Sequence, residues 1–133
     1  MTRRMLDTNT IGYLMRKNPR VARRLADIPS GQICASAVTE GEVRFGLAKR
    51  PGNAPLEAAI DAFFATIDVL PWARSTAVVY GRLRAELERR GRPLAPLDLM
   101  IAAHALEQRA VLVTSDRALV AAPGLACEDW LAS

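Results

Sequence analysis

Short apolar runs alternate along this chain with longer stretches in which apolar residues recur at helical spacing. The short runs predict strands at residues 3–6, 32–35, 68–70, 110–114 and 125–128. The longer stretches predict helices at residues 9–17, 37–49, 56–66, 76–90 and 117–121, with further helices beginning at Pro19 and Pro96. This alternation predicts an α/β protein of three layers, in which helices cover both faces of a short, mainly parallel central sheet.

The bulk composition is that of one globular domain. The 133 residues fit a single domain spanning residues 1–133, and half of them are hydrophobic. The apolar stretches are too short to cross a bilayer, and none has the length of a signal peptide. We therefore expect a cytoplasmic protein with no membrane contact. Cys34 and Cys127 each lie in a predicted strand, which indicates buried free thiols.

The charge favours a polyanionic partner. The net charge is +4 and the isoelectric point is about 9.7, with nearly all the positive charge on arginine. Arginine pairs with phosphate and stacks on bases, which suits RNA, although a GC-rich genome explains the arginine content equally well. Candidate RNA contacts form a basic run in the first two predicted helices: Arg16, Lys17, Arg20, Arg23 and Arg24.

Four acidic residues stand at positions where a parallel sheet would bring them together. Asp7 and Asp116 follow predicted strands, Asp98 lies in the first turn of a helix, and Glu42 lies beside the apolar stripe of Val38 and Phe45 on its helix. Carboxyl ends of parallel strands and the starts of the following helices share one edge of a sheet. Each aspartate taken alone is also explained as a helix cap.

Clustered carboxylates repel one another unless a cation neutralises them. Oxygen ligands select Mg²⁺ or Mn²⁺, and such an ion can promote hydrolysis of a phosphodiester. Small polar residues flank the acids and would either hold the carboxylates or a water in place or simply make turn hydrogen bonds: Thr8, Asn9, Thr114 and Ser115. The single histidine, His104, faces away from Asp98 on its helix, which favours packing or solvent exposure over a role as general base.

Four segments carry a resemblance to a known family. They are residues 5–10, 39–46, 96–105 and 112–116, followed by a closing segment at residues 123–130. In order and spacing they resemble the PIN domain and, within it, the VapC toxins of bacterial toxin–antitoxin pairs. The resemblance covers almost the whole chain.

The resemblance implies a Mg²⁺- or Mn²⁺-dependent endoribonuclease. By motif, Asp7 and Asp98 would be the main metal ligands, Glu42 would bind metal or position water, and Asp116 would be a further ligand at a position that varies among relatives. Residues 91–105 are similar to the subgroup that cuts initiator tRNA in its anticodon loop, although Ala95 and Leu97 depart from that subgroup's glycine and aromatic residue.

The resemblance also implies partners. Family members are inhibited by a small VapB antitoxin whose tail covers the site, and they form homodimers and toxin–antitoxin hetero-oligomers. Apolar residues near Leu14, Leu25 and Phe45 are candidates for an antitoxin groove, although core packing explains most of them.

Two other interpretations remain open at this point. Asp7-Thr8-Asn9-Thr10 resembles the nucleophile motif of haloacid-dehalogenase-like phosphatases, but Asn9 replaces their second aspartate and no lysine follows Lys49. A PIN fold that only binds RNA or protein would be expected to lose one or more of the acids, whereas all four are present here.

Overall fold

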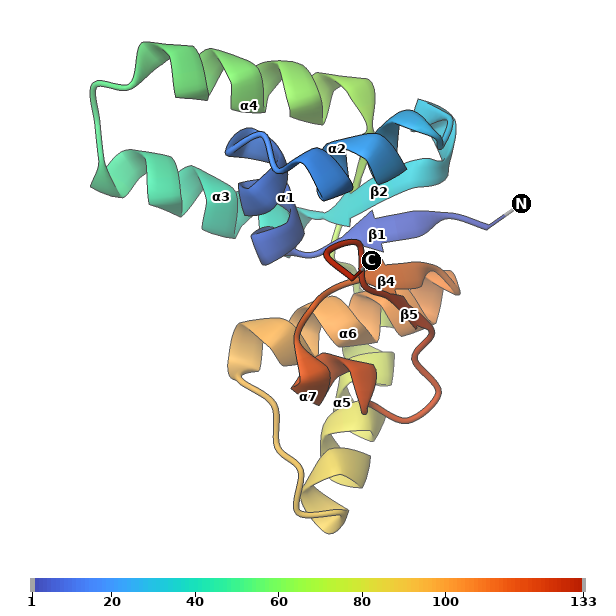
Figure 1. The fold of residues 1–133 in the computed structure, drawn as a ribbon. Coiled ribbons are helices and arrows are strands. Elements are labelled where there is room, and N and C mark those ends of the chain that lie inside the picture. Colours follow the sequence, from blue (N-terminus) through green and yellow to red (C-terminus); the bar gives the residue numbers. More distant parts are fainter. Residues whose placement is uncertain (1, 133) are drawn as a thin grey trace.

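Five parallel strands form the centre of the molecule. The computed structural model describes residues 2–132, and its sheet has the strand order β3-β2-β1-β4-β5 (Figure 1). Each neighbouring pair of strands is parallel. The strands are β1 (Arg4–Leu6), β2 (Ile33–Ser36), β3 (Asp68–Leu70), β4 (Val111–Val113) and β5 (Cys127–Glu128). Because they run the same way, their carboxyl ends lie along one edge.

Helices cover both faces of this sheet. Helices α1 to α4 lie on one side, and α5 to α7 lie on the other (Figure 1). The predicted three-layer α/β/α architecture is confirmed. The helices are α1 (Thr8–Met15), α2 (Pro19–Ala26), α3 (Ala37–Lys49), α4 (Ala54–Thr66), α5 (Arg74–Arg89), α6 (Pro96–Gln108) and α7 (Arg117–Val120), with a short 3₁₀ turn at Ser30–Gln32.

Strand side chains alternate between two hydrophobic cores. Met5 is in register with both Cys34 and Leu112, and all three pack into the core under α5 and α6. Leu6 and Val113 are paired one position further on and face the opposite core under α1, α2 and α4. The side chains at the ends of these strands are thus packed into cores on both faces of the sheet, which fixes where each strand ends.

The two cysteines are free thiols, as predicted. Cys34 is fully buried, and burial raises the pKa of its thiol to about 11. Cys127 is only half-buried, so the prediction of burial holds for Cys34 alone. No helix within residues 2–132 has the length and hydropathy to cross a membrane.

Two sequence predictions are wrong in detail. Of the predicted apolar stripe on α3, Val38 packs against the core, but Phe45 is 61% exposed; Val43 and Leu47 pack inward instead. Glycine and alanine occur both in the core and in contact with solvent, so the sequence of this helix does not indicate clearly which face is buried. Helix α4 also begins at Ala54, two residues before the predicted start at residue 56, and the Asn53 side chain caps it by accepting the amide N–H of Leu56 at 3.1 Å.

Candidate active site

Asp7 lies at the centre of the carboxyl edge, directly after the middle strand β1. Its side chain is 5% exposed, and Oδ1 accepts the Thr10 amide N–H at 2.8 Å, which caps helix α1. The Asp7 amide donates to the Val113 carbonyl at 3.1 Å, and the Thr10 hydroxyl donates to the same carbonyl at 3.1 Å. The Asp7 carboxylate is therefore held by both β1 and β4, and the cap leaves Oδ2 as the oxygen for a ligand.

Asp98 and Asp116 approach from the other side of the sheet. Asp98 lies in the first turn of α6, immediately after Pro96 and the exposed Leu97. Asp116 caps α7, where Oδ1 accepts the Ala118 amide N–H at 2.9 Å. Both carboxylates are half-buried, so each can face an incoming ligand.

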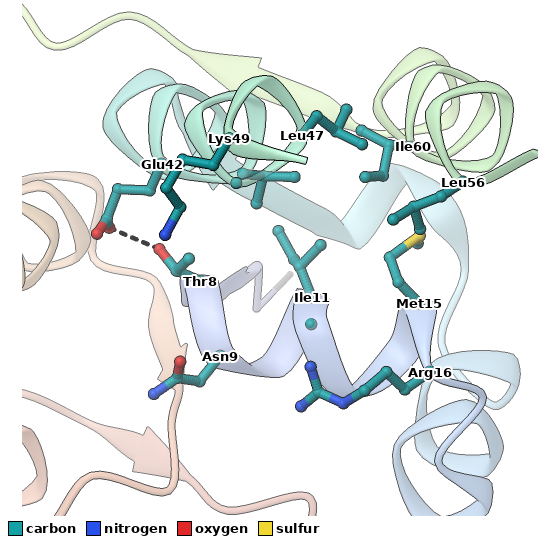
Figure 2. A pocket seen from close by; sticks show the side chains of 13 residues that line it. Thr8, Asn9, Ile11, Met15, Arg16, Glu42, Leu47, Lys49, Leu56 and Ile60 are labelled. Carbon is teal, nitrogen blue, oxygen red and sulfur yellow. Dashed lines mark hydrogen bonds between the residues drawn. The ribbon is translucent and has the colours of Figure 1, made fainter. Parts of the chain in front are cut away.

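Glu42 reaches the site from α3. Its Oε1 accepts a hydrogen bond of 2.7 Å from the Thr8 hydroxyl, which Figure 2 shows as the dashed line between the two helices. Thr8 is the first residue of α1 and directly follows Asp7. This contact therefore ties the helix that bears Glu42 to the turn that bears Asp7.

The acids influence one another electrostatically. The pKa of Asp98 is raised, first by burial and then by the negative charges of Asp116, Glu42 and Asp7. This shift requires all four carboxylates to share one region, although they come from distant parts of the sequence. The structure thus brings together the four acids that the sequence singled out.

The donor set fits a hard divalent cation. The four acidic side chains offer carboxylate oxygens as metal ligands, and Mg²⁺ and Mn²⁺ prefer oxygen ligands of this kind. Within residues 2–132, no three acidic, histidine or cysteine side chains converge closely enough to hold one ion directly. Mg²⁺ commonly takes only one or two carboxylates and keeps several waters, so this loose arrangement suits it.

The small polar residues beside the acids have distinct contacts. Thr8 bonds Glu42, and the Thr114 hydroxyl accepts the Asp116 amide N–H at 3.1 Å. Ser115 turns away and donates to Asp129 at 2.7 Å. Asn9 is exposed and lines the groove beside Glu42. Their supporting roles stay predictions.

His104 is a packing residue in the core. It is fully buried, and its Nδ1 lies 2.8 Å from the Ser36 hydroxyl, whose oxygen also caps α3 by accepting the Val38 amide. Burial lowers the pKa of its imidazole, so the ring is neutral. The contact links α6, which carries Asp98, to the start of α3, which carries Glu42.

A groove of about 470 Å³ lies between α1, α3 and α4 and is bordered by one of the four acids, Glu42 (Figure 2). Its walls include Ile11, Met15, Leu47, Leu56 and Ile60. The residues named from the sequence as groove candidates, Leu14, Leu25 and Phe45, do not line it. The sequence analysis also missed Lys49, which lines the groove seven residues after Glu42, two helical turns along the same face.

The chain resembles known proteins along almost its whole length. Residues 4–125 match the PIN domain. The "tRNA(fMet)-specific endonuclease VapC" of Shigella flexneri is 37% identical over 131 residues, covering 98% of this chain and 99% of that protein. "Ribonuclease VapC2" of Rickettsia felis is 29% identical, with 95% of this chain and 96% of that protein covered.

Solved structures show the same fold. DNA-bound VapBC from Salmonella typhimurium gives a TM-score of 0.90 at 34% identity, covering 98% of this chain and 99% of that chain. VapBC-1 from nontypeable Haemophilus influenzae gives 0.85 at 31% identity, covering 97% and 98%. The chain therefore belongs to the PIN-domain family and, within it, to the VapC proteins. This membership argues against the phosphatase interpretation.

Proposed function

We propose that this chain is a divalent-metal-dependent endoribonuclease and the toxin of a type II toxin–antitoxin pair. The observation that carries the proposal is the position of four carboxylates at one edge of the sheet: Asp7 caps α1, Asp116 caps α7, Asp98 lies in the first turn of α6, and Glu42 is tied to the Asp7 turn through Thr8. Burial and then the charges of the other three acids raise the pKa of Asp98. Buried carboxylates that repel one another are costly unless a cation joins them. The nuclease names of the VapC relatives support the same chemistry.

Asp7 and Asp98 are the residues that would hold Mg²⁺ or Mn²⁺. Asp116 would be a further ligand acting through an ion-bound water, since no three acidic side chains within residues 2–132 converge on one ion. Such an ion supplies charge neutralisation on the phosphodiester and makes a water easier to ionise. The cap on Asp7 fixes that carboxylate before any ligand arrives. Asp116 is fixed in the same way by its own cap.

Glu42 is assigned to position the attacking water. Its contact with Thr8 holds one carboxylate oxygen and leaves the other to accept a hydrogen bond from water. In the reaction, the water oxygen bonds to phosphorus as one ester P–O bond breaks, and the departing oxygen takes up a proton. One product then ends in a phosphate and the other in a hydroxyl.

We propose tRNA as the substrate, with the anticodon loop of initiator tRNA as the first candidate. The relative from Shigella flexneri is named for tRNA(fMet). The net charge of +4 favours approach to an RNA backbone. A single-stranded loop can also bring its phosphodiesters into the active site, because no paired strand stands in the way.

We further propose that a VapB-type antitoxin inhibits the chain by filling the groove beside Glu42, and that the toxin is a homodimer. The groove is mostly apolar, and two of the residues that line it, Arg16 and Lys49, are positively charged. An amphipathic segment with acidic residues would suit such walls. The solved relatives from Salmonella and Haemophilus are VapBC complexes.

Cleavage of total tRNA by the purified chain tests the proposed activity. We expect discrete fragments in Mg²⁺, loss of these fragments in EDTA, and loss in Asp7→Asn and Asp98→Asn. Mapping the fragment ends identifies the substrate. A folded, antitoxin-free protein that cleaves no RNA would refute the nuclease and favour a binding module. Cleavage that survives both substitutions would refute the assigned site.

A further inference from the structure

We propose that Phe45 and Lys49 form a subsite that stacks a nucleobase next to the scissile bond and contacts an adjacent phosphate. This inference rests on the proposed nuclease function and names the part of the RNA that the outer face of α3 would recognise. It concerns residues outside the acidic cluster.

The subsite lies on the same helix face as Glu42. Phe45 follows Glu42 by three residues and Lys49 follows it by seven, so the three side chains project from one side of α3. Phe45 is 61% exposed, although it is a large aromatic residue. An aromatic ring is therefore presented to solvent one helical turn from a candidate catalytic acid.

Lys49 is positioned at this ring. Its Nζ lies 4.8 Å from the ring centroid of Phe45, within the range of a cation–π contact. The contact holds the ring against the helix on one side and places a positive charge beside it. Lys49 also lines the groove that contains Thr8 and Glu42, so this charge borders the acidic site.

Single-stranded RNA has the matching chemistry. Proteins recognise unpaired bases by stacking them on aromatic side chains, while cations contact the neighbouring phosphates. Here the ring and the ammonium are adjacent, and Glu42, one of the acids that would act at the phosphodiester, lies one helical turn from the ring. A nucleotide flanking the cut would therefore meet Phe45 with its base and Lys49 with its phosphate.

The surroundings favour RNA over a docked peptide at Phe45. The apolar groove between α1, α3 and α4 is lined by other residues, and Phe45 lies outside its walls. Leu97, which precedes Asp98, is also exposed, at 44%. Exposed apolar side chains thus stand close in sequence to acids on both α3 and α6, where flanking bases would lie.

Steady-state cleavage of the mapped tRNA tests the subsite. Phe45→Ala is expected to raise KM roughly 5- to 150-fold, the range for losing one stacked base, with kcat nearly unchanged. Phe45→Trp should keep the wild-type KM, whereas Phe45→Leu, which is apolar but cannot stack, should behave like Phe45→Ala. Val78→Ala, at an exposed position on α5, is the matched control and should change nothing.

A change in the RNA provides the second arm. An abasic nucleotide on one side of the cut should raise the wild-type KM by a similar factor but leave Phe45→Ala unaffected, because the stacked base is already lost. If the wild-type protein cleaves RNA and Phe45→Ala has the same KM, the subsite is overturned while the nuclease stands. A wild-type KM in Phe45→Leu would have the same meaning. Wild-type protein that cleaves no RNA would overturn both the subsite and the nuclease.

Discussion

The Thr8 hydroxyl donates a hydrogen bond of 2.7 Å to Glu42, joining the first turn of α1 to the middle of α3. Thr8→Val removes the donor and keeps the shape of the side chain. We expect kcat for RNA cleavage to fall roughly tenfold, the usual cost of removing a residue that orients a group at a metal site, with little change in Tm. Thr66→Val is the control, since its hydroxyl bonds only the Phe63 carbonyl on α4. Equal effects of both substitutions would contradict this role.

Removing the Asp98 charge should stabilise the metal-free protein. The folded pKa of Asp98 is raised by burial and by the other three carboxylates, so ionisation costs stability above that pKa. Asp98→Asn is expected to raise Tm in EDTA at neutral pH, while abolishing cleavage. The gain should shrink as pH falls through the raised pKa, because wild-type Asp98 then becomes neutral.

Thermal unfolding at several pH values, with and without Mg²⁺, measures this effect. Mg²⁺ should stabilise the wild-type protein more than Asp98→Asn. A lower Tm for the variant in EDTA at neutral pH would show that Asp98 is stabilised by a partner rather than strained by its neighbours.

His104 should make stability depend on pH below neutrality. Burial lowers its folded pKa, with Arg3 acting in the same direction and Glu107 opposing it. Between that lowered value and the unfolded pKa of about 6.5, the unfolded chain binds more protons. The stability associated with neutral His104 is therefore present above about pH 6.5 and is lost as pH falls below it.

Urea unfolding of wild type and His104→Asn between about pH 7 and pH 5.5 tests this expectation. His104 is the only histidine in the sequence, which makes the assignment direct. The wild-type free energy of unfolding should fall with pH more steeply than that of the variant. Parallel curves would show that His104 does not control the pH dependence.

The basic face of α2 should set the salt dependence of RNA binding. Arg20, Arg23 and Arg24 surround a hollow of about 420 Å³ with Trp130. If Arg23 contacts a phosphate, Arg23→Gln should lower the slope of log affinity against log salt by about 1. Arg84→Gln on α5 is the control, because Arg84 pairs with Glu88 at 2.9 Å. Filter binding across a salt series should give the control the same slope as the wild-type protein. Equal slopes for both variants and the wild type would show that Arg23 does not contact a phosphate.

The order of strands and helices was predictable because each buried strand has a short apolar signature. Met5 on β1 and Leu112 on β4, for example, are apolar residues of strands that helices cover on both sides. The positions of Asp7 and Asp116 followed from the same logic, since a parallel sheet gathers its carboxyl ends at one edge. The strand ends therefore singled out two of the four acids, whereas Glu42 was singled out by its place beside Phe45, which is exposed.

The environment of individual helix faces was less predictable. Phe45 was assigned to an apolar stripe, yet it faces solvent, because small residues around it fit either side of α3 equally well. Leu97 is apolar and is nevertheless exposed at the start of α6. Tertiary packing decided both cases, and the groove lining depended on how three helices met in space.

Divalent-cation binding tests the central claim most directly, because the account requires the acidic cluster to bind an ion through Asp7 and Asp98. Mn²⁺ binding followed by electron paramagnetic resonance should show a site in the wild-type protein. Affinity should fall at least about tenfold in Asp7→Asn and in Asp98→Asn, as expected when a carboxylate at a metal site is lost. Asp27→Asn, at an exposed residue that ends α2, should bind as wild type does. Equal Mn²⁺ binding by all four proteins, or no binding by wild type, would contradict the account.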